Sequence, residues 1–360
     1  MRTSLGISIV ACLGVFVAVA ANAPAQRTAA PPAQSTAAAD ATNRIVAAAQ
    51  AVLGTLDEAG RIKVQFPFEN PQKTKWSNLP SGIFQREGIR LADLTPAQRG
   101  AVDTLLSTAL SADGYRKVTE IMRADGVLGR GQAGGRAGGP PGGGGGRGGN
   151  LRFAEDEYFL TFLGTPSATA PWMLQFGGHH LAINLTLGGS QASMAPSLPA
   201  TQPATYTFEG RTIRPLGDEN DKGFALINAL NEDQRKQAIL GSRVADLVLG
   251  PGQDGRTIQP EGIRALALSA AHQTMLLDLV REWVGIQTDA FTEPRMAEIR
   301  ANLPDTYFAW SGPTEPGSVA YFRIQGPTLV IEYAPQKSVE HIHTIYRDPT
   351  NDYGAKFTRK

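Results

Sequence analysis

Cysteine is almost absent from this chain of 360 residues. The single cysteine, Cys12, lies within an apolar N-terminal stretch that has the pattern of a secretory signal. If that signal is removed, no thiol remains, which excludes disulfide bonds, cysteine nucleophiles and cysteine metal ligands. The fold must then be stabilised by side-chain packing alone, or by packing together with a metal.

An excess of charge of either sign is also lacking. The chain has 34 Lys and Arg against 33 Asp and Glu, and removing a signal whose only charge is Arg2 balances the two signs. Nucleic-acid binding needs a basic surface, so we expect no nucleic-acid partner. Because the chain is neutral overall, its charge does not indicate a class of substrate, and both a small molecule and a polymer remain possible. No feature of the sequence predicts an oligomeric state.

The N-terminal apolar run, Leu5–Ala21, is short for a membrane span. Ala18–Ala20 or Ala21–Ala23 supplies small residues for cleavage. We therefore predict a signal peptide over residues 1–23, a periplasmic or extracellular protein, and no membrane span after cleavage. The residues around Cys12 loosely resemble a lipoprotein box, but apolar residues continue beyond it, which favours an ordinary signal.

Familiar catalytic and cofactor motifs are missing or out of context. GxSxG and HExxH do not occur. Gly129–Gly134 matches GxGxxG, but it lies in a glycine tract without the strand and helix that dinucleotide binding requires. Asp218–Gly223 begins like a calcium loop, yet Lys222 and Ala229 stand where ligands are needed.

A weak internal repeat organises the rest of the chain. Gln85–Arg90 recurs as Gln259–Arg264, and each copy precedes a helix-periodic stretch, a Tyr-Phe pair and two extended runs. This predicts a duplicated unit of helices followed by an antiparallel β-hairpin, in one pseudo-symmetric α+β domain. The predicted boundaries are a flexible Ala/Pro-rich tether at 24–40, a domain at 41–354, unit one at about 60–200, unit two at about 205–335 and a tail at 336–354.

Local patterns predict individual elements. Thr95 as N-cap and Pro96 as the first helical residue mark a helix start. The glycine-rich segment 129–149 cannot bury enough apolar surface to order itself and predicts a disordered loop in unit one. Periodicity further predicts a strand at 205–214 and helices at 221–230 and 232–249.

Four of the five histidines fall in two pairs, His179 with His180 and His341 with His343. Histidine is the commonest metal ligand and the usual acid or base at neutral pH. Residues two apart on a strand share a face, so His341 and His343 predict two ligands of one divalent metal. His272 stands alone in a helical stretch, which predicts a structural role.

The alternation of side chains along a strand bears on which residue of the first pair is the ligand. His179 shares the expected buried face of Leu181, whereas His180 shares the other face with Asn184. This favours His180 as the ligand, but the turn at Gly177–Gly178 can reverse the assignment, so both remain candidates. Neither pair belongs to the repeated scaffold. If the tail strand returns beside unit one, both pairs meet at the junction of the two units.

The polar turn after the second pair supplies further candidate residues. Asp348 is expected to ligate the metal, orient a histidine or act as a general base. Arg347 is expected to bind an anionic group of the substrate, and Asn184 to position the substrate. For Asp348, ordinary turn chemistry before Pro349 explains the residue equally well.

Three segments of the chain resemble a known family: Lys75–Pro80, Pro171–Leu181 and His341–Asp348. They are similar to the domain-of-unknown-function 3500 family, whose members are largely exported bacterial proteins. The resemblance covers roughly residues 45–354, with the glycine tract as a local insertion. It implies export, but no activity, cofactor or catalytic residue.

The residues themselves favour an exported metal-dependent hydrolase or lyase that holds zinc, or else copper, through the two histidine pairs. The alternative is a non-catalytic periplasmic protein that binds a metal or a small ligand. A third possibility is that the histidines are structural and the protein is an interaction partner in the cell envelope.

Overall fold

A twelve-stranded sheet runs through the part of the chain that the computed structural model describes, residues 33–136 and 151–358. The order of neighbouring strands is β1 (Gln65–Phe66), β3 (Phe159–Leu163), β4 (Trp172–Gly178), β5 (Leu181–Gly188), β7 (Leu198–Thr201), β14 (Ile342–Arg347), β13 (Leu329–Pro335), β12 (Tyr321–Gly326), β11 (Tyr307–Ser311) and β10 (Ile263–Arg264). Off this path, β2 (Ile89–Arg90) pairs with β3, and β6 (Gln191–Ser193) pairs with β5.

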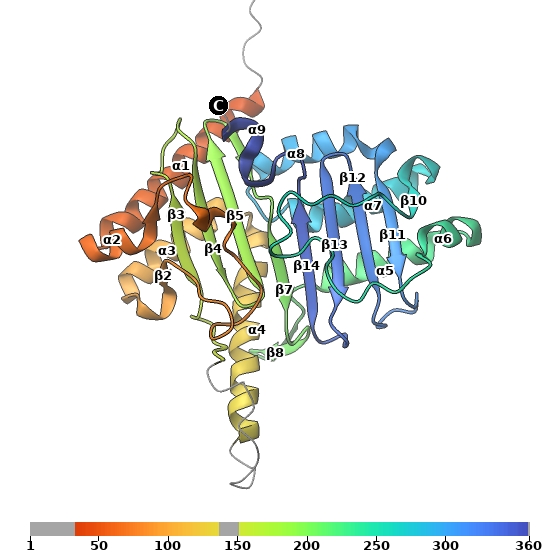
Figure 1. The fold of residues 1–360 in the computed structure, drawn as a ribbon, viewed down its shortest axis with the longest axis horizontal. Helices are drawn as coiled ribbons and strands as arrows, with labels where there is room; N and C mark the ends of the chain where they lie inside the picture. The colour runs from red at the N-terminus through yellow and green to blue at the C-terminus, as the bar shows by residue number, and fades with distance from the viewer. Residues whose placement is uncertain (1–32, 137–150, 359–360) are drawn as a thin grey trace, which may run out of the picture. The chain divides into compact units, whose positions relative to one another are not determined.

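Neighbouring strands are antiparallel except β1 and β3. We call residues 33–201 the first half and residues 202–335 the second half; β14 follows both. Figure 1 shows β14 between β13 of the second half and β7 of the first. The tail strand therefore returns beside the first part of the chain, which is the condition under which the two histidine pairs were expected to meet. The mixed α+β class predicted from the sequence is confirmed.

Helices cover one face of the sheet and long coils cross the other (Figure 1). The helices are α1 (Ala33–Thr55), α2 (Glu58–Val64), α3 (Pro96–Ala109), α4 (Ala112–Arg136), α5 (Gly217–Ala229), α6 (Glu232–Ala238), α7 (Ala270–Val284), α8 (Asp289–Ala301) and α9 (Ala355–Thr358). Short 3-10 turns lie at Pro71–Thr74, Leu91–Asp93, Ala265–Ala267, Leu303–Asp305 and Asp352–Gly354. Among the described residues, no helix is long and apolar enough to cross a membrane.

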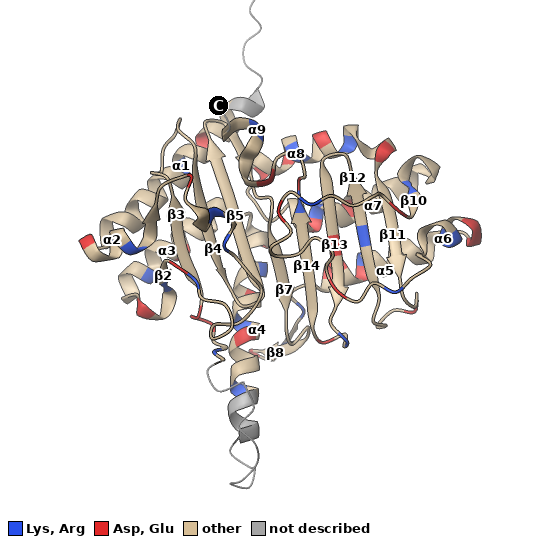
Figure 2. Cartoon of the chain, in the orientation of Figure 1, with Lys and Arg blue, Asp and Glu red and all other residues tan. Residues whose placement is uncertain are grey.

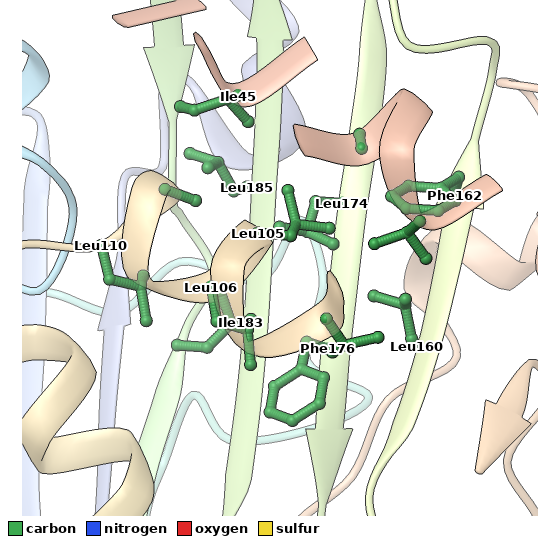
Figure 3. Packing of buried hydrophobic residues seen from close by; sticks show 14 of the residues in the cluster. Ile45, Leu105, Leu106, Leu110, Leu160, Phe162, Leu174, Phe176, Ile183 and Leu185 are labelled. Carbon is green, nitrogen blue, oxygen red and sulfur yellow. The ribbon is translucent and has the colours of Figure 1, made fainter. Parts of the chain in front are cut away.

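Helix α3 shows why the elements form where they do. Thr95 caps its N-terminus and Gln98 completes the capping box, as the sequence predicts for this start. Leu105 and Leu106 face the strands and are buried (Figure 3). Each buried leucine contributes about 1.5–3 kcal/mol relative to an exposed one, so this apolar stripe fixes the helix on the sheet. Charged residues lie mainly on helices and coils (Figure 2).

Several predicted boundaries differ from the structure. The expected signal and residues 24–32 of the expected tether lie outside the described residues, and α1 already begins at Ala33. In the predicted glycine loop, α4 continues to Arg136, and residues 137–149 lie outside the described residues. Helix α4 therefore includes glycines that the composition alone predicted to lie in a loop.

Two predicted elements of the second half are wrong. The expected strand 205–214 is a separate hairpin of β8 (Tyr206–Phe208) and β9 (Arg211–Ile213), off the main sheet. The expected helix 232–249 ends at Ala238, after which the chain crosses the face of the sheet as coil. Glu332 of β13 holds that coil, because its carboxylate accepts hydrogen bonds from the backbone amides of Val248 and Leu249, both at 2.7 Å.

Two glycines allow close backbone packing before β2 and β10. Gly88 has φ +103°, and a Cβ there would lie 2.3 Å from the Leu160 carbonyl oxygen. Gly262 has φ +97°, and a Cβ would lie 2.2 Å from the Phe308 carbonyl oxygen. An L side chain at either position combines backbone strain with a steric clash.

We expect Gly88→Ala and Gly262→Ala each to lower the free energy of unfolding by about 2 kcal/mol or more, measured by urea denaturation. The matched control is Gly100→Ala in α3, where an added Cβ meets open space. That control should raise stability by about 0.5–1 kcal/mol, since alanine favours the helix. Equal effects at the three positions would contradict the packing argument.

Candidate metal centre

The first histidine pair forms the turn between β4 and β5. Gly178 pairs with Leu181, so His179 and His180 are the two residues of the hairpin loop. His180 has φ +61°, a left-handed conformation that histidine adopts more readily than most residues. The alternation of strand faces therefore does not apply to this pair. The turn instead brings the two imidazole rings together, with centroids 3.5 Å apart.

The second pair lies at the start of β14. His343 pairs with Ala200 of β7, whose backbone amide donates a hydrogen bond to the carbonyl oxygen of His180 at 2.8 Å. His341 and His343 lie two residues apart along the chain, and their ring centroids are 4.6 Å apart. Because β7 lies between β5 and β14, the hairpin turn and the tail strand meet at the junction of the two halves.

Three imidazoles converge at this junction. His180 Nε2 lies 3.0 Å from His341 Nε2, and the ring centroids of His180 and His343 are 5.7 Å apart. One ligand nitrogen from each of the three residues lies within 4.8 Å of the others. Ligands at about 2.1 Å around a tetrahedral zinc lie about 3.4 Å from one another, so small adjustments of the rings would fit such an ion. We call these three residues the histidine site.

A buried carboxylate lies behind His180. Asp125 of α4 has Oδ1 at 3.1 Å from His180 Nδ1 and at 2.9 Å from His179 Nδ1. The Tyr158 hydroxyl lies 2.6 Å from Asp125 Oδ2. A carboxylate only accepts hydrogen bonds, so both Nδ1 atoms carry protons and His180 Nε2 is left as an acceptor for a metal.

Asp125, His179 and His180 also have one donor atom each within 4.8 Å of one another. Burial raises the pKa of Asp125, but hydrogen bonds from the two histidines outweigh burial and hold the pKa below its ordinary value. Asp125 is thus a satisfied hydrogen-bond acceptor. We infer that Asp125, together with Tyr158, orients the rings of His179 and His180. His179 therefore lies beside the histidine site and is not one of its three residues.

The coils on the open face of the sheet add two polar groups. The Asn78 side-chain amide lies 3.1 Å from His343 Nε2, and Asp246 Oδ1 lies 3.5 Å from His343 Nδ1. Asp246 Oδ1 also accepts hydrogen bonds from the Leu247 amide and the Gln336 side chain, both at 2.6 Å. Burial raises the pKa of Asp246, but these contacts and His343 lower it overall.

The electrostatics favour neutral imidazoles. Burial, and next the neighbouring His179, lower the pKa of His180 to about 3. Burial, and next His343, lower the pKa of His341 to about 4. A metal binds the neutral ring, so both histidines are in the ligating form at neutral pH.

The other residues expected at the site are engaged elsewhere. Arg347 donates to the Leu249 and Gly250 carbonyl oxygens and pairs with Asp254 and Asp352. None of its recorded partners among the described residues is a histidine. It lies at the other end of β14 from His343, so the structure does not bring it to the histidine site.

Asp348 and Asn184 also have partners of their own. Asp348 pairs with Arg295 at 3.1 Å and accepts a hydrogen bond from the Thr350 hydroxyl at 2.7 Å. Asn184 bonds to the Gln175 side chain and to the Pro196 carbonyl oxygen, and is fully buried. The structure therefore does not bring Asp348 or Asn184 into contact with the histidines. His272 lies on α7 in the second half, away from both pairs in sequence and fold.

Sequence reasoning missed Asp125 and Asp246. Asp125 lies within α4, 54 residues before His179, and no local motif links the two. Asp246 was assigned to a helix that in fact ends at Ala238. Asn78 falls within Lys75–Pro80, a segment that carries the family resemblance but no link to the histidines. Long-range packing creates all three contacts, and one sequence carries no direct signal of it.

Comparison with known proteins gives one match. The family described as "Protein of unknown function (DUF3500)" matches residues 38–355, which is most of the chain. No curated protein and no solved structure matches the chain.

Proposed function

The chain belongs to this family, whose description assigns no activity, and we propose from its own residues that it is an exported metal-dependent enzyme, a hydrolase or a lyase. His180, His341 and His343 hold a zinc-like divalent ion in this proposal. The observation that carries it is the convergence of three imidazoles, with one ligand nitrogen from each within 4.8 Å of the others, one of them backed by a buried carboxylate.

The set of donors supports zinc most directly. Three histidines with one open position are a usual ligand set of catalytic zinc, and a carboxylate behind a ligand histidine fixes its tautomer. Such an ion supplies Lewis acidity and brings the pKa of a coordinated water to about 7. Nitrogen ligands also suit copper, so the metal titration below includes both ions.

Three side chains near the metal have further roles in this proposal. Asp125 holds His180 in the ligating tautomer. Asp246, whose side chain is 57% exposed beside His343, is the nearby carboxylate that can accept a proton from the reacting group. In this proposal Asp246 takes the role of base that the sequence suggested for Asp348. Asn78, which contacts His343, positions the substrate in place of Asn184.

We also propose that the two halves descend from a duplication. Gly88–Ile89–Arg90 and Gly262–Ile263–Arg264 each combine a left-handed glycine with a short strand that pairs with β3 or β11. The hairpins β4–β5 and β12–β13 each have a two-residue loop. If so, α3 with β3–β5 should superpose on α7 with β11–β13. Strands that superpose while the helices do not would contradict duplication.

Export is tested by sequencing the N-terminus of the protein recovered outside the cytoplasm. We expect it to begin at Ala21 or Pro24, since small residues precede both positions. An intact N-terminus in the cytoplasmic fraction would contradict the proposal, and a lipid on Cys12 would favour the lipoprotein reading.

The orienting role of Asp125 predicts a metal-affinity effect. Asp125→Asn should weaken zinc binding about 10- to 100-fold, because the substituted amide no longer fixes the His180 tautomer. The thermal midpoint of the metal-free form serves as the control for folding, and Asp113→Asn on the exposed start of α4 serves as the matched variant. Zinc binding by Asp125→Asn at wild-type affinity would remove Asp125 from the site.

The metal itself is tested on protein purified without an affinity tag, by titration with zinc and copper. We expect one equivalent to bind, and His180→Ala, His341→Ala and His343→Ala each to weaken binding at least about a hundredfold. His272→Ala should bind as the wild type does. A His343→Ala variant that retains full occupancy, or no binding of either ion by the wild type, would refute the ligand set.

Activity then separates the enzyme from the alternative. The zinc-loaded protein and His341→Ala are compared on activated carboxylic, phosphate and sulfate esters. Turnover that is lost with His341→Ala supports a hydrolase. Tight metal binding without any turnover, including elimination from acidic C–H substrates, supports the non-catalytic metal-binding protein instead.

A further inference from the structure

Two basic side chains near the histidine site lack an acidic partner. Arg243 lies in the coil after α6, and Lys337 lies in the turn after β13. Among the described residues, neither forms an ion pair. Two unpaired cations in one place concentrate positive charge.

Both cations line one cavity of about 230 Å³. Ser311 and Tyr321 of the sheet also line it, as does Pro335. None of the residues that line this cavity is acidic. The cavity is too small for a large ligand but has room for one charged group and a few attached atoms. We call it the basic cavity.

The same two chain segments form the basic cavity and the edge of the histidine site. Arg243 and Ala245 line the cavity, and the next residue, Asp246, turns its carboxylate toward His343. Gln336 lies next to Lys337, donates to Asp246, and its backbone amide donates to the His341 carbonyl oxygen. The cavity and the histidine site are therefore neighbours.

The pairing of the strands gives the distance between the basic cavity and the histidine site. Phe322 pairs with Tyr333, so Tyr321 lies opposite Ala334, and Ala334 pairs with His343. Residues opposite one another in an antiparallel sheet point to the same face. Two steps between strands place Tyr321, which lines the cavity, about 10 Å from the backbone of His343. A substrate of ordinary size spans that distance.

We propose that the basic cavity binds an anionic group of the substrate, a carboxylate, phosphate or sulfate, while the reacting group of the same molecule lies at the histidine site. This inference rests on the proposed function and adds to it a substrate class. Arg243 and Lys337 supply charge-assisted hydrogen bonds to the anion. Their role is binding and selection of the substrate.

The first experiment tests the cavity alone. Sodium sulfate, phosphate and acetate are titrated into the full-length protein as purified, with chloride balancing the ionic strength. We expect saturable binding of at least one anion, weakened about tenfold by Arg243→Gln and by Lys337→Gln. The matched control is Arg300→Gln on the exposed side of α8, which should bind as the wild type does.

The anion that binds most tightly indicates which anionic group the substrate carries, because sulfate and phosphate are tetrahedral whereas acetate is planar. Binding that is insensitive to Arg243→Gln and Lys337→Gln would place the anion elsewhere, for example on the metal, and would overturn the proposal. The absence of saturable binding for all three anions, or an equal loss with Arg300→Gln, would overturn it as well.

The second experiment joins the two sites. An alkyl hydroxamate that ends in a carboxylate, with a chain spanning about 10 Å, is compared with the same hydroxamate ending in a methyl group. The carboxylate should tighten binding to the zinc-loaded protein about tenfold, and Arg243→Gln with Lys337→Gln should abolish the difference. Equal binding of the two hydroxamates would refute the link between the sites. Failure of both to bind, with anion binding intact, would refute an open position on the metal and leave the cavity as an independent anion site.

Discussion

Backbone pairing of β14 on both of its edges joins the two halves of the molecule. On one side β14 pairs with β13 over the residues Val330 to Pro335. On the other side it pairs with β7 through Ile342 and His343, with a further bridge between Ser197 and Tyr346. Without this strand, β7 and β13 would be exposed edges with unsatisfied backbone groups. The histidine site lies at this junction, so it exists only when the two halves are joined.

The helix layer joins the halves a second time. Lys117 of α4 in the first half forms a buried ion pair with Glu219 of α5 and a second one with Glu282 of α7. Breaking a buried pair by removing one partner costs about 3–5 kcal/mol, because the other charge stays buried. These contacts therefore link the helices of the two halves, as β14 links their strands. The two links together hold His180 and His341 within hydrogen-bond distance.

The sequence predicts those parts of the fold that local interactions determine. The capping residues of α3, its buried leucines and the β4–β5 hairpin follow from nearest neighbours along the chain. The two histidine pairs were expected to meet on the condition that the tail strand returns beside unit one, and the pairing of β14 with β7 meets that condition. Asp125 and Asp246 could not be found in this way. Their contacts depend on the position of α4 and on a coil held by Glu332, both of which are long-range effects.

A metal at this junction would change the energetics of the whole molecule, since its ligands come from both sides of the joint. His180 belongs to the first half, whereas His341 and His343 lie on the strand that follows the second. An ion that binds only the joined form stabilises it by about 4 kcal/mol at a concentration a thousand times its dissociation constant. In a chain without disulfides, that is a large share of a typical stability of about 5–15 kcal/mol. Catalysis and stability would then depend on the same three imidazoles. The buried Asp125 already accepts hydrogen bonds from two histidines without a metal, so it would keep the junction ordered before an ion binds.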